Sequence, residues 1–149
     1  MGLLNYSYCI HTDSLAFSGP SFNRLAFVGF SMAKNILIVD DSRLARLLIK
    51  AVIDDILPGS AITEADSANN ALDLAKDFKA FDISIIDFNM PGRTGLELYA
   101  ALASVVYIER KALLTANVQD AIRDAAESAG VTFLSKPVDE AVIRAFIES

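Results

Sequence analysis

Residues 36–42, Ile36-Leu37-Ile38-Val39-Asp40-Asp41-Ser42, decide the fold because they join a strand, an acidic pair and a helix start. Four consecutive aliphatic residues are typical of a strand that is covered on both faces. Ser42 can cap the helix that follows. The apolar residues of that helix recur at the spacing of one amphipathic face: Leu44, Leu47, Leu48, Ala51 and Val52.

The alternation of apolar strand and amphipathic helix continues to the end of the chain. Strands are predicted at 36–39, 61–65, 83–86, 112–114 and 131–134, with a helix after each. Residues 105–110 fit either a helix extension or a loop. Strand-helix units of this length predict an α/β fold with a parallel sheet and helices on both faces. Its crossovers are expected to be right-handed.

Polar residues follow four of these strands at the point where each strand ends. Asp40 and Asp41 follow the first strand, Asp87 the third, Thr115 the fourth and Lys136 the fifth. Ligands of such sheets bind outside the carboxyl ends of the strands. We therefore expect these side chains to meet at one edge of the sheet.

Three neighbouring carboxylates repel one another, so a site that holds them needs a compensating positive charge. Two unit charges 4 Å apart repel by about 1 kcal/mol in water and by about 4 kcal/mol in a partly screened site. A divalent cation and the facing ammonium of Lys136 would offset that repulsion. Taken singly, each residue has a plain structural explanation: a helix cap for Asp40-Asp41, a turn for Asp87, a backbone hydrogen bond for Thr115, or a solvated charge for Lys136. Together they favour a metal and phosphoryl site.

Composition excludes several classes of function. The net charge of −6 argues against a nucleic-acid surface, and no apolar run approaches the ~18 residues that span a bilayer. Cys9 and His11 are the only residues of their kinds, so nucleophilic triads and the usual zinc sites are excluded from the motif-bearing region. A single cysteine forms no internal disulfide, which suits a cytoplasmic protein.

The first 31 residues differ from the rest of the chain. Residues 1–31 are rich in Ser, Gly, Asn and Phe and keep no strand or helix period. We predict one domain over residues 32–149, with 1–31 as a disordered or non-native extension. The alternative is that these residues pack as an additional element.

Four segments carry a family resemblance. They are Ile36–Ser42, Ile85-Ile86-Asp87-Phe88-Asn89-Met90-Pro91-Gly92, Leu113-Leu114-Thr115-Ala116 and Phe133-Leu134-Ser135-Lys136-Pro137. Together they resemble the receiver domain of response regulators in two-component signalling, including the chemotaxis regulators. The resemblance covers the chain from Lys34 to its end. It implies a flavodoxin-like, doubly wound sheet of five strands in the order 2-1-3-4-5.

The resemblance also implies a reaction. Asp87 would be the phosphoacceptor, served by a sensor histidine kinase or a histidine phosphotransfer protein. Mg²⁺ would be the cofactor, with Mn²⁺ as the alternative ion, because hard oxygen ligands suit both. The implied metal ligands are Asp40, Asp41, Asp87 and the backbone carbonyl of Asn89.

Further roles follow from the same resemblance. Lys136 would oppose the phosphoryl charge, and Thr115 with Ala116 would bind the phosphoryl group. The bond between Lys136 and Pro137 is expected to be cis. Phe133 would act with Thr115 as a switch, although it could equally be a core aromatic. The downstream protein effector would bind the face formed by the last two helices and the strand between them.

Three alternatives remain open at this point. An aspartate-based phosphohydrolase would need a proton-transferring acid at position 89, where this chain has Asn89. A degenerate receiver that acts only as a binding module would not need the full set of site residues. The chain could also be a piece of a larger regulator. As an enzyme, we expect at most self-phosphorylation from small phosphodonors and slow autodephosphorylation, with no direct nucleic-acid or membrane partner.

Overall fold

Buried aliphatic runs form a single parallel sheet in the order β2-β1-β3-β4-β5. The structure is a computed structural model that describes residues 33–149, so the predictions for residues 1–31 lie outside the described part. The strands are β1 (Asn35–Val39), β2 (Ala61–Ala65), β3 (Ala80–Asp87), β4 (Tyr107–Thr115) and β5 (Thr132–Ser135). The helices are α1 (Arg43–Ile56), α2 (Ala68–Ala75), α3 (Gly95–Leu102), α4 (Asp120–Ser128) and α5 (Glu140–Glu148). The predicted fold class and strand order are confirmed.

Side-chain caps fix where most of the helices begin. Ser42 accepts a hydrogen bond from the backbone N–H of Ala45 at the start of α1, and Ser67 caps α2 in the same way. Thr94 and Glu97 form a reciprocal capping box at the start of α3. Such caps satisfy N–H groups that the first helical turn leaves without partners. The helix that carries the acidic pair at its entrance therefore starts at a defined residue.

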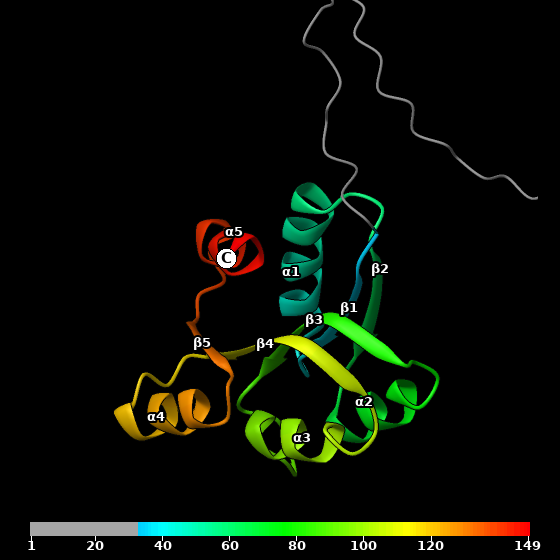
Figure 1. Cartoon of the computed structure of the whole chain (residues 1–149). Coiled ribbons are helices and arrows are strands. Elements are labelled where there is room, and N and C mark those ends of the chain that lie inside the picture. Colours follow the sequence, from blue (N-terminus) through cyan, green and yellow to red (C-terminus); the bar gives the residue numbers. More distant parts are fainter. Residues whose placement is uncertain (1–32) are drawn as a thin grey trace, which may run out of the picture. The chain divides into compact units, whose positions relative to one another are not determined.

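The helices form two layers around the sheet. Helices α1 and α5 cover one face, and α2, α3 and α4 cover the other (Figure 1). Each layer has its own hydrophobic core. Ile38, Ile49 and Phe146 belong to the first core, and Leu98 and Ala126 belong to the second. No helix within the described residues is long and apolar enough to cross a membrane.

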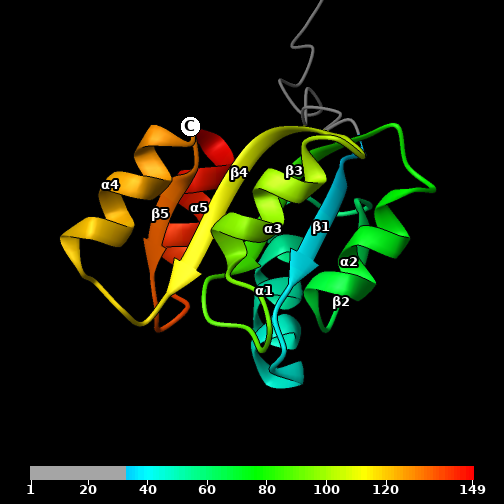
Figure 2. The same cartoon turned by 90° about the horizontal axis from the view of Figure 1, so that it is seen from below.

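The register of the sheet brings the carboxyl ends of the strands to one level. Val39 of β1 pairs with Ile86 of β3, and Asp87 pairs with Leu114 of β4. The arrows of β1 and β4 point to the same edge of the sheet (Figure 2). This edge is the place where the sequence predicted the site.

Most of the apolar face predicted for α1 does not pack on the sheet, although Val52 does pack against the core there. Leu44, Leu47 and Leu48 are 66%, 49% and 51% exposed, whereas Ile49 and Ile53 are buried. The helix carries apolar residues on more than one face. Periodicity alone therefore could not decide which face contacts the core.

Of residues 105–110, the first two lie outside helix and strand, as the loop alternative expected, but β4 begins at Tyr107, so residues 107–110 are strand. Tyr107 pairs with Ala80 of β3, but β5 pairs with β4 only from Ala112 onward. The first half of β4 thus lies at an open edge of the sheet. Charged residues are acceptable at such an edge. Because they interrupt the apolar run that predicts a buried strand, the sequence pattern did not indicate this half of β4.

Candidate functional site

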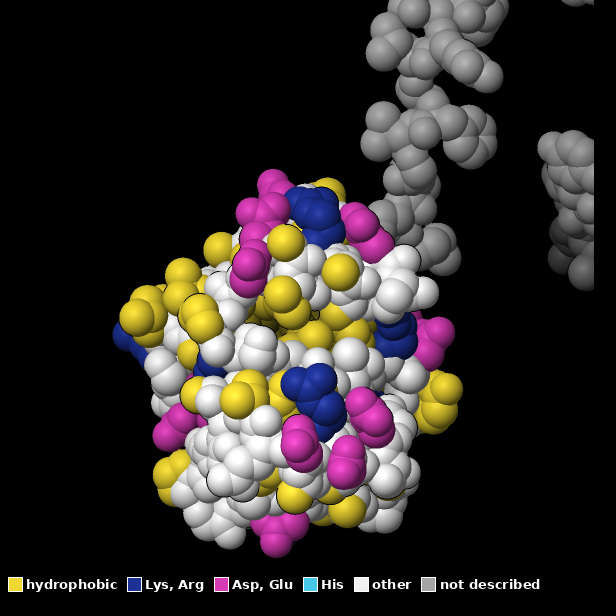
Figure 3. Space-filling model, turned by 90° about the vertical axis from the view of Figure 1, so that its left-hand side faces the viewer, with side chains coloured by type: hydrophobic (Ala, Val, Ile, Leu, Met, Phe, Trp, Pro, Cys, Tyr) yellow, Lys and Arg dark blue, Asp and Glu magenta, His cyan; other side chains and the backbone are white. Residues whose placement is uncertain are grey.

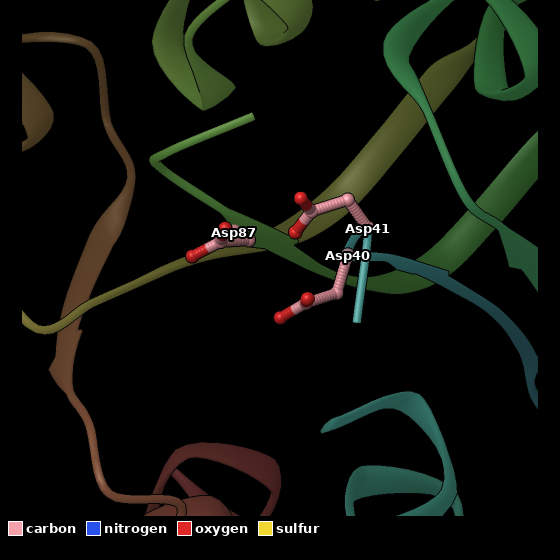
Figure 4. A group of neighbouring side chains, drawn as sticks. All are labelled: Asp40, Asp41 and Asp87. Carbon is pink, nitrogen blue, oxygen red and sulfur yellow. The ribbon is translucent and has the colours of Figure 1, made fainter. Parts of the chain in front are cut away.

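Three aspartates meet at the carboxyl edge of the sheet. Asp40 and Asp41 follow β1, and Asp87 is the last residue of β3 (Figure 4). One carboxylate oxygen from each lies within 4.8 Å of the others. Asp40 and Asp87 are buried, whereas Asp41 is exposed. This cluster of hard oxygen donors, open to solvent on the side of Asp41, fits a divalent cation.

Asp40 has a partner for each of its side-chain oxygens. Its Oδ1 accepts a hydrogen bond from the backbone N–H of Ser42 at 2.8 Å, and its Oδ2 accepts one from Lys136 Nζ at 2.9 Å. Lys136 contacts only Oδ1 of the Asp87 carboxylate, and no ion pair engages Asp41 within residues 33–149. Asp40 therefore organises the site, and the other two carboxylates are the better candidates for direct metal ligands.

Lys136 links the two buried aspartates across the sheet. Its Nζ lies 2.9 Å from Asp40 Oδ2 and 2.9 Å from Asp87 Oδ1, and its side chain is only 25% exposed. The backbone N–H of Lys136 donates to the carbonyl oxygen of Thr115 at 2.8 Å, which fixes where the side chain starts. One ammonium thus contacts two carboxylates that are far apart in the sequence.

Burial sets the protonation behaviour of the central pair. Burial raises the pKa of Asp87, and neither the hydrogen bond nor the charge of Lys136 fully reverses this. Burial alone would lower the pKa of Lys136, but its bonds to Asp40 and Asp87 outweigh burial and raise that pKa. Lys136 therefore keeps its charge, and the ionised form of Asp87 remains under-compensated. A cation placed beside Asp87 would supply the missing stabilisation.

Thr115 lies at the same edge but its hydroxyl does not bond to the aspartates. Thr115 is fully buried, and its Oγ1 accepts a hydrogen bond from the backbone N–H of Asn117 at 3.0 Å. Ala116 is exposed next to it, and Phe133 of β5 is half-buried. The peptide bond between Lys136 and Pro137 is cis. The structure thus joins Asp40, Asp41, Asp87 and Lys136 directly and holds Thr115 in a local turn.

Arg46 is a supporting residue that the sequence reading missed. Its Nη1 donates to the backbone carbonyl of Asp40 at 2.7 Å, and its Nε lies 3.4 Å from Glu64 Oε2 on β2. Arg46 lies one helical turn after the cap residue Ser42, so its side chain can reach back to the acidic loop. The sequence signal that could have identified Arg46 is a basic residue one helical turn after the acidic pair and its cap.

Gly95 is a second supporting residue that the sequence reading did not single out. It begins α3 and donates its N–H to the carbonyl of Phe88 at 3.0 Å. A Cβ at this position would lie 2.5 Å from the carbonyl oxygen of Asp87 and 2.7 Å from Leu113 Cδ1. The close approach of α3 to the end of β3 therefore requires a glycine.

The Gly95→Ala variant is expected to lose stability and to disturb Asp87. The added methyl group must displace the Asp87 backbone or Leu113, and overpacking of this kind costs about 1–3 kcal/mol. Chemical denaturation measures the loss, and calorimetric titration with Mg²⁺ measures the effect on the acidic cluster.

Gly59→Ala is the matched control. Gly59 has a φ of +84°, so a side chain there is strained, but a Cβ would meet nothing within 4 Å. Both variants should be less stable than the wild type, and only Gly95→Ala should bind Mg²⁺ more weakly. Equal Mg²⁺ binding by both would contradict the role assigned to Gly95.

Comparisons with known sequences agree with this geometry. The profile of the response regulator receiver domain family matches residues 36–148. The chemotaxis protein CheY of Pseudomonas aeruginosa is 32% identical over 116 residues, which are 76% of this chain and 92% of that protein. The cyclic di-GMP phosphodiesterase response regulator RpfG of Xanthomonas campestris is 32% identical over 114 residues, 74% of this chain but only 30% of that protein.

Solved structures show the same fold. The chemotaxis protein CheY4 of Vibrio cholerae superimposes with a TM-score of 0.66 at 24% identity, over 78% of this chain and 97% of that one. The receiver domain of the response regulator NarL from Mycobacterium tuberculosis gives a TM-score of 0.63 at 27% identity, over 78% of this chain and 94% of that one. The likeness covers nearly the whole of both neighbours.

Proposed function

Because the chain belongs to the family of response regulator receiver domains, we propose that Asp87 accepts a phosphoryl group from a phosphohistidine of a sensor kinase or phosphotransfer protein. One observation carries the proposal. Asp87 is buried at the end of β3, within reach of one ammonium and two further carboxylates. That is the arrangement that a carboxylate nucleophile and its countercharges need.

The transfer is a single displacement at phosphorus. An oxygen of the Asp87 carboxylate attacks the phosphorus atom, and a P–O bond forms as the P–N bond to the histidine breaks. The electron pair of the broken bond goes to the imidazole nitrogen, which takes up a proton. Lys136, now 2.9 Å from Asp87 Oδ1, opposes the charge of the arriving phosphoryl oxygens.

Mg²⁺ is the proposed cofactor, with Mn²⁺ as a substitute. Asp41, Asp87 and the backbone carbonyl of Asn89 would hold it, and Asp40 would contribute through water. When bound, the cation neutralises charge on the phosphoryl oxygens. Asn89 cannot act as the general base that takes a proton from the water attacking an aspartyl-phosphate, so the aspartyl-phosphate should persist as a signal.

A small phosphodonor tests the proposal without the cognate kinase. Acetyl phosphate should phosphorylate the chain when Mg²⁺ is present and should not do so in excess EDTA. Phosphate incorporation that is equal in both conditions would contradict the proposed metal site.

Thr115 and Phe133 are the proposed switch. Thr115 would release the N–H of Asn117 and turn toward the phosphoryl group on Asp87. Phe133 would then move inward, and the surface of α4, β5 and α5 would change. In the structure, hydrophobic side chains gather around a shallow hollow on that face, with charged side chains above and below it (Figure 3). This surface is the proposed binding site of a downstream protein. We also propose that the chain is located in the cytoplasm.

The exposed leucines of α1 are the proposed docking surface for the phosphodonor protein. Leu44, Leu47 and Leu48 lie on the first turns of the helix that starts directly after the acidic pair. With a rise of 1.5 Å per residue, they lie within roughly 10 Å of that pair along the helix. A protein that brings a histidine to Asp87 must also cover these turns. Apolar side chains there favour a partner with an apolar surface.

The Leu48→Gln variant is expected to accept phosphate more slowly from a protein donor only. Loss of one central apolar contact that contributes about 1 kcal/mol should slow transfer about fivefold. Glutamine keeps a good helix propensity, so the fold should persist. The measurement is the rate of phosphate transfer from a panel of phosphorylated kinases and phosphotransfer proteins.

Labelling by acetyl phosphate is the internal control for that variant. Tyr107→Gln is the matched surface control, since Tyr107 is 67% exposed at the start of β4, at the opposite edge of the sheet. If acetyl phosphate labelling of Leu48→Gln falls as far as protein transfer does, Leu48 supports the site and not the docking.

A further inference from the structure

Arg123 of α4 lies over the ring of Phe133 on β5. Its guanidinium carbon is 4.8 Å from the centre of the ring, the distance of a cation–π contact. Arg123 itself is exposed, and Phe133 is half-buried. No ion pair engages Arg123 within residues 33–149. The ring of Phe133 is therefore the partner that orients this arginine.

The sheet register relates this contact to the phosphoryl site. Leu113 of β4 pairs with Phe133, and Thr115 pairs with Ser135. Paired residues of parallel strands share a face, and so do residues two apart on one strand. Thr115 and Phe133 thus lie on the same face as diagonal neighbours. Leu113 packs in the core that includes Ala126 of α4, so α4 covers this face.

We propose that Arg123 is a positioning residue that holds Phe133 in the half-buried conformation seen here and so opposes activation. The proposal rests on the function proposed above. A conformer in which the ring turns inward loses the contact with Arg123, so the contact favours the state seen here. Any ligand that prefers the inward state must then overcome this preference, which lowers its apparent affinity.

Exposed cation–π contacts shift such an equilibrium by about two- to fivefold. Removal of the guanidinium should therefore make the inward state easier to reach by that factor. The effect must act through the ring of Phe133. This requirement separates a positioning role from a general effect of losing one positive charge near an anionic site.

Binding of beryllofluoride, a phosphoryl mimic, to the full chain in Mg²⁺ tests the proposal by calorimetry. Arg123→Gln should bind the mimic about two- to fivefold more tightly than the wild type. Arg123→Lys keeps a cation over the ring and should stay near the wild type. In a Phe133→Leu background, adding Arg123→Gln should change nothing, because the ring is already absent.

Two outcomes would overturn the proposal. One is an unchanged or weaker affinity of Arg123→Gln in the wild-type background. The other is an equal effect with and without the ring, which would make Arg123 an electrostatic influence only. Failure of the proposed function gives a different result, since the wild-type chain itself would then not bind beryllofluoride in Mg²⁺. Because Arg123 is exposed, Arg123→Gln should fold normally, and its metal-free melting curve checks this.

Discussion

Acetyl phosphate with Mg²⁺ is expected to add one phosphoryl group to the wild-type chain and none to the Asp87→Asn variant. The amide of asparagine has nearly the shape of the carboxylate but is not a nucleophile toward phosphorus. Asp40 keeps both of its hydrogen bonds in this variant, and Lys136 keeps Asp40 as a partner at 2.9 Å. The fold and most of the site should therefore survive while the reaction is lost.

Intact-mass spectrometry measures this loss directly. Asp73→Asn is the matched control, because Asp73 is a solvent-exposed aspartate of α2 whose side chain pairs with Lys76 at 2.7 Å, away from the site. It should be phosphorylated like the wild type. A phosphoryl group on Asp87→Asn would mean that another residue is the acceptor and that the central assignment is wrong.

The second large effect concerns stability. Without metal, Asp87→Asn is expected to be more stable than the wild type by about 1 kcal/mol, the repulsion of two unit charges 4 Å apart in water. For a domain of this size that corresponds to roughly 3–6 °C in melting temperature. Burial acts in the same direction as this repulsion, because it raises the pKa of Asp87 despite Lys136, so the ionised side chain weakens the fold.

The direction of the Asp87 pKa shift also determines how the extra stability of Asp87→Asn depends on pH. Below the ordinary value of 3.8, both the folded and the unfolded chain hold the proton, and Asp87 has no effect on stability. Above the raised pKa of Asp87 in the folded chain, ionisation of this side chain favours the unfolded state. The free energy of unfolding of the wild type is then lowered by the full amount. The advantage of Asp87→Asn should thus grow as the pH rises through this range and then stay constant.

Mg²⁺ should reverse the order of stability. A ligand at a hundred times its dissociation constant stabilises the folded state by about 2.7 kcal/mol. The wild type should gain this stabilisation, whereas Asp87→Asn, which lacks one ligand, should gain much less. Melting curves of both proteins with and without Mg²⁺ measure this reversal in their order of stability. If Asp87→Asn is less stable without metal, then the carboxylate is a structural ion pair with Lys136 and its ionised form is not under-compensated.

The arrangement of the site followed from the sequence because few physical rules determine it. Buried aliphatic runs end at Asp40, Asp87 and Thr115, and parallel strands bring those ends to one edge. The same rule predicted that Lys136 would meet Asp40, which lies 96 positions earlier in the chain. The family that these motifs resembled is confirmed by the match to residues 36–148.

Other features depend on three-dimensional packing that periodicity does not encode. The leucines of α1 and its buried isoleucines have similar spacing, so the sequence could not say which face meets the sheet. The role of Gly95 depends on how closely α3 approaches the carbonyl of Asp87. The contact of Arg123 with Phe133 joins a helix and a strand whose relative placement only the folded chain defines.

Identification of the phosphorylated residue in the wild-type chain tests the central claim most directly. Borohydride reduces an aspartyl-phosphate to homoserine, and peptide mass spectrometry then locates the altered residue. After treatment with acetyl phosphate and Mg²⁺, homoserine is expected at position 87, and not at 40 or 41, and it should be absent when EDTA replaces Mg²⁺. Homoserine at position 40 or 41, or none at all in a phosphorylated chain, would contradict the account.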